Sequence, residues 1–185
     1  EWLFDLMAWG AYDLGGDLGV TAFRALLSGG LFALAALLAL RLGASPAFAF
    51  ASIVAFLPIF RMSLEVRPHL AAYVLAALSL LVVVGRRAGV GRIAALAGLA
   101  VLWANTHGSF PVALAIAALW VVMPTGEAAD GLRERLRRAS SVVAVALATL
   151  LNPWGIDLIG TVLHHTDRRI LDLVPEWWPV AWGDL

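Results

Sequence analysis

The stretch "VLWANTHGSFPVALAIAALW", residues 101–120, is an apolar run with a polar break in its middle. Residues 105–109, Asn-Thr-His-Gly-Ser, lie where a membrane helix or a buried strand tolerates polar side chains least. Gly108 and Pro111 favour the end of a helix here, and the amide of Asn105 can hydrogen-bond the backbone groups that the break leaves free. The stretch therefore predicts two apolar helices joined by a polar connection.

The composition of the whole chain is typical of a membrane protein. Of 185 residues, 62% are hydrophobic and 14% are charged, whereas soluble domains average about 45–50% and 25%. The apolar runs are continuous rather than alternating, which favours spanning helices over barrel strands. Net charge is zero and cysteine is absent, so no basic surface for nucleic acid is expected. We predict an all-α, polytopic helical membrane protein.

Six apolar segments are visible, at about 20–40, 45–60, 69–85, 93–104, 110–124 and 139–151. The first reaches the roughly 20 residues of a spanning helix, and the last three are short. Residues 1–17 are mixed and aromatic, as expected of an interfacial approach helix, and 18–151 form the membrane bundle. Residues 152–185 are expected to form an external interfacial segment. We interpret 1–185 as one transmembrane domain, a piece of a longer protein.

Arginine placement predicts the orientation of these segments. Alternate connections hold eight arginines, Arg41, Arg86, Arg87, Arg92, Arg133, Arg135, Arg137 and Arg138, and such connections are usually cytoplasmic. The opposite side has Arg61, Arg67, Arg168 and Arg169, with Arg24 nearby. All four histidines, both asparagines and seven of eight tryptophans then fall at or near the outer side. This distribution indicates a working outer face, or an aromatic anchor.

Two of the helix breaks are expected to lie below the outer surface. Asn105 follows Arg92 by thirteen residues and Asn152 follows Arg138 by fourteen, each a climb of roughly 20 Å through a hydrocarbon core of about 30 Å. Non-helical backbone at that depth must be buried in protein or line a wet cavity. We predict one outward-opening cavity that both asparagines line and that Arg67 or His69 borders. In the alternative, each asparagine only caps its own helix.

Other polar residues are candidates for ligand contacts. His107 is a metal ligand, a general base or a hydrogen-bonding wall residue. A divalent metal held by His69, His107 and one of His164 and His165 stays open, although no spacing supports it. Arg67 suits a phosphate or carboxylate, or a snorkelling contact with lipid headgroups. Residues 155–174 predict an amphipathic interfacial helix, with its apolar face made by Ile156, Ile159, Leu163, Ile170 and Val174.

Five short motifs occur in order along the chain: "EWL" from Glu1, "RPH" (67–69), "LWAN-x-HG-x-F" (102–110), "NP-aromatic-G" (152–155) and "EW-x-P" (176–179). Together they resemble bacterial multi-pass proteins of the GT-C glycosyltransferase superfamily. Ser109 stands where that pattern often has a second glycine, and Trp154 where it often has tyrosine.

The resemblance implies transfer of a sugar from a polyprenyl-phosphate carrier to an acceptor at the outer face of the bacterial inner membrane. It implies that Arg67 contacts the donor phosphate, that Asn105, His107 and Asn152 contact the sugar, and that His69 and Glu176 belong to the same substrate-binding face. The catalytic carboxylate of the superfamily is expected upstream of Glu1, and neither Glu1 nor Asp5 is assigned that role.

Two other classes of function remain open at this point. One is a non-catalytic membrane subunit that keeps the fold and packs against membrane-protein partners. The other is a transporter, whose site is built from broken helices. No inverted repeat is visible and no carboxylate lies inside the six apolar segments, which disfavours a proton- or sodium-coupled carrier.

Overall fold

The computed structural model describes residues 1–60, 64–84, 88–123 and 131–164, and these ranges are helical, as the sequence predicts. Glu176, His165, Arg61 and the second half of the predicted interfacial helix lie outside the described residues. The helices are α1 (Trp2–Arg41), α2 (Pro46–Phe60), α3 (Pro68–Val83), α4 (Val90–Thr106), α5 (Pro111–Val122), α6 (Leu132–Thr149) and α7 (Asp157–His164). The predicted break is where it was expected, between α4 and α5.

The start of α6 differs from the prediction. The helix begins at Leu132 after Gly131, so Arg133, Arg135, Arg137 and Arg138 lie in its first two turns and not in the preceding connection. Arginine is a good helix former, and a charged, amphipathic turn can extend an apolar helix into water. The sequence interpretation treats these charged residues as part of a connection, whereas they belong to the helix.

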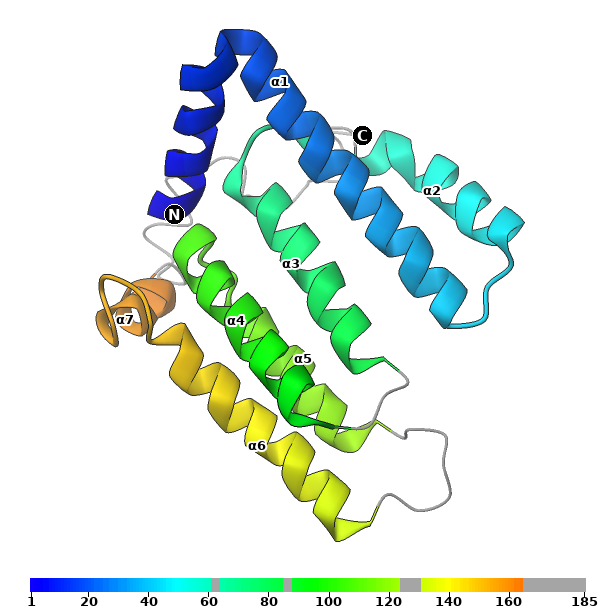
Figure 1. Ribbon diagram of the computed structural model, residues 1–185, viewed down its shortest axis with the longest axis vertical. Helices are drawn as coiled ribbons and strands as arrows, with labels where there is room; N and C mark the ends of the chain where they lie inside the picture. Colours follow the sequence, from blue (N-terminus) through cyan, green and yellow to red (C-terminus); the bar gives the residue numbers. More distant parts are fainter. Residues whose placement is uncertain (61–63, 85–87, 124–130, 165–185) are drawn as a thin grey trace, which may run out of the picture.

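α1 consists of two helical halves that meet at a sharp kink. The backbone leaves helical geometry at Gly15 (φ −150°, ψ 15°) and Gly16 (φ 55°, ψ −140°), and the second pair of angles is open almost only to glycine. The kink matches the predicted boundary between the approach helix and the first long apolar segment. Figure 1 shows the first half folded back toward the end of α4, while the second half runs along α3 to α2.

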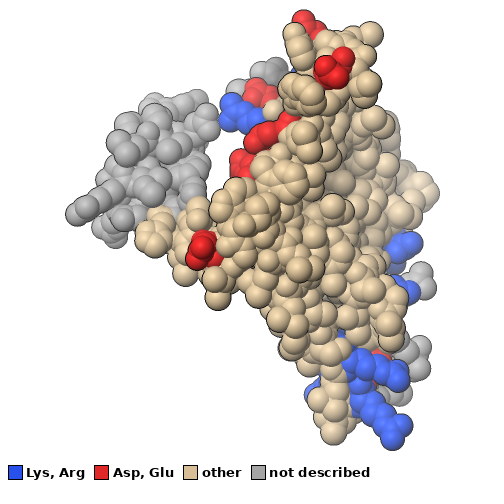
Figure 2. Space-filling model, turned by 60° about the vertical axis from the view of Figure 1, so that its left-hand side comes forward, with Lys and Arg blue, Asp and Glu red and all other residues tan. Residues whose placement is uncertain are grey.

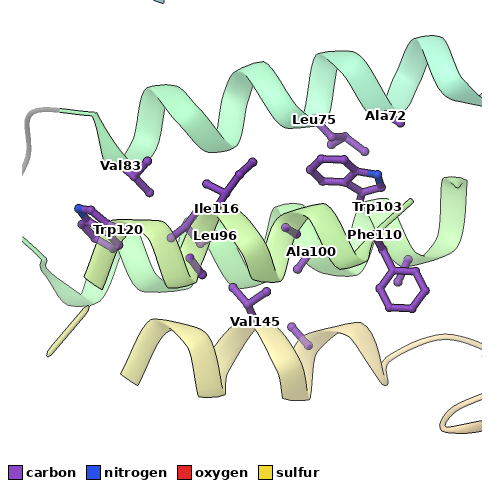
Figure 3. Close-up of a cluster of buried hydrophobic side chains, with 14 of the residues drawn as sticks. Ala72, Leu75, Val83, Leu96, Ala100, Trp103, Phe110, Ile116, Trp120 and Val145 are labelled. Atoms are coloured by element: carbon purple, nitrogen blue, oxygen red, sulfur yellow. The ribbon is translucent and has the colours of Figure 1, made fainter. Parts of the chain in front are cut away.

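The core lies between α3, α4, α5 and α6. Trp103 and Trp120 are each 1% exposed and Val145 is fully buried, and with Leu75 and Leu96 they belong to one cluster of buried apolar side chains (Figure 3). Two large indole rings in one small bundle remove much apolar surface from water. This cluster fixes the relative positions of the ends of α4 and α6, where the polar residues follow.

One described helix, α1, is long and apolar enough to cross a membrane; α2, α3, α4 and α5 are shorter apolar helices. α2 packs beside α1 at the edge of the bundle, with most of its residues exposed. Phe50 is 70% exposed there, Leu26 on α1 is 75% exposed, and Leu147 on α6 is 61% exposed. Large apolar side chains thus cover much of the outside of the bundle.

Charge separates along the bundle (Figure 2). At one end, here called the arginine end, α1, α3 and α5 finish and α4 and α6 begin. There arginines donate to carbonyls in the last turns of helices: Arg41 Nη1 to Leu81 O (3.1 Å), Arg92 Nη1 to Val82 O (3.0 Å) and Arg138 Nη1 to Met123 O (2.6 Å). These carbonyls have no partner within their own helix, so the arginines stabilise this end.

The opposite end, here called the acidic end, contains the start of α3, the ends of α4 and α6, and α7. Six of the seven acidic residues that the structure describes belong to this end or to the first half of α1 with its kink: Glu1, Asp5, Asp13, Asp17, Glu65 and Asp157. The seventh, Glu134, pairs with Arg138 at the arginine end. The described arginines away from the arginine end are Arg24 and Arg67.

Candidate site at the acidic end of the bundle

Asn105 joins three segments that are far apart in sequence. Its side chain lies in the last turn of α4, and the residue is 5% exposed. Nδ2 donates to the carbonyl of Leu151, just past α6 (2.9 Å), and to that of Val101 in its own helix (2.8 Å). Oδ1 accepts the indole N–H of Trp2 (3.0 Å). Both amide hydrogens are thus used inside the protein, and the amide holds the start of α1, the end of α4 and the end of α6 together.

Asn152 makes only local hydrogen bonds. Nδ2 donates to the carbonyls of Thr149 (2.8 Å) and Gly155 (3.2 Å), and Oδ1 accepts the backbone N–H of Trp154 (2.8 Å). This pattern caps the end of α6 and closes the turn that follows. Gly155 has φ 54°, which explains a glycine at that position. The contacts of Asn152 therefore match the alternative in which the asparagine caps its own helix.

The two asparagines nevertheless line one pocket, as predicted. Its volume is about 560 Å³, and it lies between the start of α1, the last turns of α4 and the chain leaving α6. The lining residues are Trp2, Leu3, Val101, Leu102, Asn105, Leu150, Leu151, Asn152 and Pro153. Arg67 and His69 are not among them, so the predicted border of the pocket is wrong on that side. The pocket is largely apolar, with the two amides in its wall.

His107 follows the last turn of α4 in an extended conformation and is not among the residues that line the pocket. Its Nδ1 accepts the backbone N–H of Ser109 (3.0 Å) and lies 2.7 Å from Ser109 Oγ. Since Nδ1 is an acceptor, the neutral ring carries its proton on Nε2. Nε2 lies 3.7 Å from a carboxylate oxygen of Glu1. The ring therefore links the break after α4 to the start of the chain.

The environment of His107 disfavours its charged form. Burial lowers the pKa of His107 below its ordinary value of 6.5, the Glu1 carboxylate opposes this shift, and His69 adds to it. His107 is thus close enough to both residues for their charges to act on it. A neutral imidazole here is a hydrogen-bond donor at Nε2 and can accept a proton through rearrangement of its contacts with Ser109.

Arg67 and His69 lie at the start of α3. Arg67 precedes the helix, and its Nε lies 3.1 Å from a carboxylate oxygen of Glu65, with both side chains half exposed. The His69 ring packs against that of Tyr73, with the ring centroids 5.6 Å apart. Glu65 was not predicted as a partner, although its position two residues before Arg67 was the available signal. The guanidinium remains half accessible at the acidic end.

The remaining predictions concern α7 and a metal. The apolar face expected of the interfacial helix is exposed, since Ile156 and Leu163 are 70% and 64% exposed. Leu158 and Val162 pack against the core instead. Among the residues that the structure describes, no three His, Cys, Asp or Glu side chains gather as a metal site.

Comparison with known proteins adds no assignment: no family model, no curated protein and no solved structure matches this chain. A function must therefore be argued from the geometry of the acidic end and from the motifs that lie there.

Proposed function

We propose that this chain is the membrane domain of a polytopic protein that transfers a sugar from a polyprenyl-phosphate carrier to an acceptor at the outer membrane face. The membrane part of the proposal is supported by α1, which is long and apolar enough to span a bilayer. It is also supported by the exposed apolar side chains around the bundle, since soluble monomers rarely expose large contiguous apolar surfaces.

The separation of charge supports the orientation. Basic residues are retained on the cytoplasmic side of membrane proteins, and six described arginines lie at the arginine end: Arg41, Arg92, Arg133, Arg135, Arg137 and Arg138. The acidic end then faces the outside of a bacterial inner membrane. A sugar linked to a lipid carrier would approach the pocket of Asn105 and Asn152 from the outer leaflet.

The single observation that carries the proposal is the meeting of two sequence motifs beside one pocket. Glu1 and Trp2 of the "EWL" motif contact His107 and Asn105 of the "WANTHGSF" break, although more than 100 residues separate them. If the polar residues of the break only capped α4, no contact with the start of the chain would be expected. A shared site explains why the polar groups of both motifs meet at one place.

The described residues suggest a division of roles. In the transfer, the acceptor hydroxyl attacks the anomeric carbon, the bond to the phosphate oxygen breaks, and a base removes the hydroxyl proton. We assign to Glu1 and His107, 3.7 Å apart, the contacts with sugar or acceptor hydroxyls. The carrier phosphate is assigned to Arg67, which lies outside the pocket lining, is half exposed and pairs with Glu65. Asn105 and Asn152 shape the pocket, because their amides are occupied within the protein. Glu176 stays a predicted contact outside the described residues.

The test uses the full-length protein in vesicles of its native membrane, which supply the acceptor hydroxyl. A panel of polyprenyl-phosphate-linked hexoses serves as donors, and release of polyprenyl phosphate is the readout. Arg67→Lys should lower turnover at least tenfold while the protein still inserts, because the point charge of lysine does not reproduce the planar guanidinium. His107→Ala removes the ring and should likewise lower turnover at least tenfold while the protein still inserts. His164→Ala is the matched control, since that ring is exposed and, among the described residues, lies 2.7 Å from the carbonyl of Gly160 in its own helix. Turnover unchanged in both site variants would refute the proposed roles.

A non-catalytic subunit is the second candidate, and one observation favours it. Asn105 donates both amide hydrogens to carbonyls inside the protein, as expected of a residue that holds helices together rather than one that binds sugar. The two candidates separate in the same vesicles. An enzyme releases polyprenyl phosphate from at least one donor, whereas a subunit releases none and is recovered together with membrane-protein partners.

A further inference from the structure

The first half of α1, residues 1–14, is here called the arm. It leaves the long apolar part of α1 at the kink and returns toward the end of α4 (Figure 1). Its tip supplies two of the residues that line the pocket, Trp2 and Leu3. The pocket is open to the outside, and the arm supplies one of its walls.

The kink that joins the arm to the rest of α1 contains glycines that a larger residue cannot replace. Gly16 has φ 55° and ψ −140°, a conformation that L side chains rarely adopt. Gly19, one turn further on, faces the carbonyl oxygen of Ala11 so closely that a Cβ there would overlap it. Gly10, inside the arm, has open space around its Cα. The chain thus places glycine where the two halves approach and has no such need at Gly10.

The arm is held to the end of α4 by its tip. Trp2 donates its indole N–H to Asn105, and Glu1 lies 3.7 Å from the ring of His107. Glu1 is half exposed and the His107 side chain is 25% exposed, so water screens this pair. Among the residues that the structure describes, these are the polar contacts that join the arm to α4.

Between tip and kink the arm is weakly attached. Phe4 is buried against Phe23 of the second half of α1, with ring centroids 5.8 Å apart. Further along, Trp9 is 63% exposed and Leu14 is 90% exposed. Segments with few buried contacts are the ones that open locally at low free energy. Among the described residues, rotation at the kink would mainly break the Phe4 contact and the tip contacts.

We propose that the arm is a hinged cover of one side of the pocket, with Gly15 and Gly16 as the hinge and the Trp2–Asn105 hydrogen bond as the latch. The inference rests on the proposed function only in taking the pocket as the place where substrate enters. In the closed state the indole of Trp2 forms one wall of the pocket. In the open state the arm swings away at the hinge and this wall of the pocket is removed, which widens access to the two asparagines, as the movement of lids does in many enzymes.

The first experiment measures the position of the arm. The chain has no cysteine, so spin labels at Leu6→Cys on the arm and Val112→Cys at the start of α5, both exposed, report one distance in the full protein in vesicles. We expect a main short distance and a minor longer one. Trp2→Phe keeps a ring and removes the N–H donor, so the share of the longer distance should rise about fivefold, the effect of one net hydrogen bond.

The hinge is tested with a matched pair of glycine substitutions. Gly19→Ala introduces a Cβ against the carbonyl of Ala11 and should shift the distance to the longer value. Gly10→Ala should leave the distribution unchanged. In parallel, a thiol at Val101→Cys, inside the pocket, should react with a small maleimide about five times faster when Trp2→Phe is added.

The results separate the cover from the proposed function. A single distance that neither Trp2→Phe nor Gly19→Ala alters, with unchanged labelling at Val101→Cys, would show that the arm is a fixed wall and overturn the inference. If the distances respond but no hexose donor is turned over, the cover stands and the sugar-transfer proposal fails. Should Gly19→Ala not fold, Trp2→Phe alone decides between a latch and a wall.

Discussion

Asn105→Leu removes the amide that joins three segments while nearly conserving side-chain volume. The indole N–H of Trp2 and the carbonyl of Leu151 both lose their partner. With a net contribution of about 0.5–1.5 kcal/mol for each hydrogen bond, the free energy of unfolding should fall by about 1–3 kcal/mol. Asn152→Ala removes three hydrogen bonds within one partly exposed turn after α6, where water can replace the lost partner, and should cost about 1 kcal/mol.

The sharper measurement is a double-mutant cycle that combines each asparagine variant with Trp2→Phe. The free energy of unfolding of each variant is measured by equilibrium unfolding of the full protein in mixed micelles. Asn105→Leu and Trp2→Phe should show a coupling energy of about 1 kcal/mol, because each removes one partner of the same bond. Asn152→Ala and Trp2→Phe should add within about 0.5 kcal/mol, since Asn152 bonds only its own turn. Equal coupling at the two asparagines, or none at Asn105, would refute the reasoning.

Two further predictions concern a buried cation and a buried ring. Arg138 is fully buried, pairs with Glu134 (3.2 Å) and donates to the last carbonyls of α5; Arg138→Leu should destabilise the protein by about 3 kcal/mol or more. The exposed Arg135→Leu should change the same unfolding free energy by less than about 0.5 kcal/mol, and similar losses in both would contradict this account of the arginine end. Burial lowers the pKa of His107, so the unfolded chain binds more protons and stability falls as pH drops below about 6.5. Titration of unfolding from pH 7 to 5 should show a smaller loss in His107→Gln, and an identical pH profile would show that this ring is not responsible.

The sequence predicted the helices because continuous apolar runs interrupted by glycine and proline leave few alternatives. The division of α1 followed from the mixed composition before residue 17, and the end of α4 from the polar residues at 105–109. Arg133 and its neighbours were placed in a connection because their charge was weighed above their helix propensity. That choice depends on how far α6 projects beyond the core, which composition does not encode.

Contacts at the site were harder to predict than helix ends. The sequence placed Asn105 and Asn152 at similar breaks, yet one joins distant segments and the other caps its own turn. The difference arises because the kink at Gly16 returns Trp2 to the end of α4, and no local pattern specifies where a returning arm lands. The expectation that Arg67 borders the pocket is wrong for the same reason: the start of α1 forms that wall, and Arg67 pairs with Glu65 beside α3.

The central claim is a bundle that crosses the membrane with its acidic end, and therefore its pocket, outside. Single cysteines at Gly108, in the exposed break after α4, and at exposed Gly131, before α6, report the two ends without competition from native thiols. Thr106 is unsuitable because it is buried and bonded to its own helix. In intact cells, a membrane-impermeant maleimide should label Gly108→Cys and leave Gly131→Cys unlabelled until the membrane is opened. Labelling of Gly131→Cys in intact cells, or of both cysteines, would contradict the account.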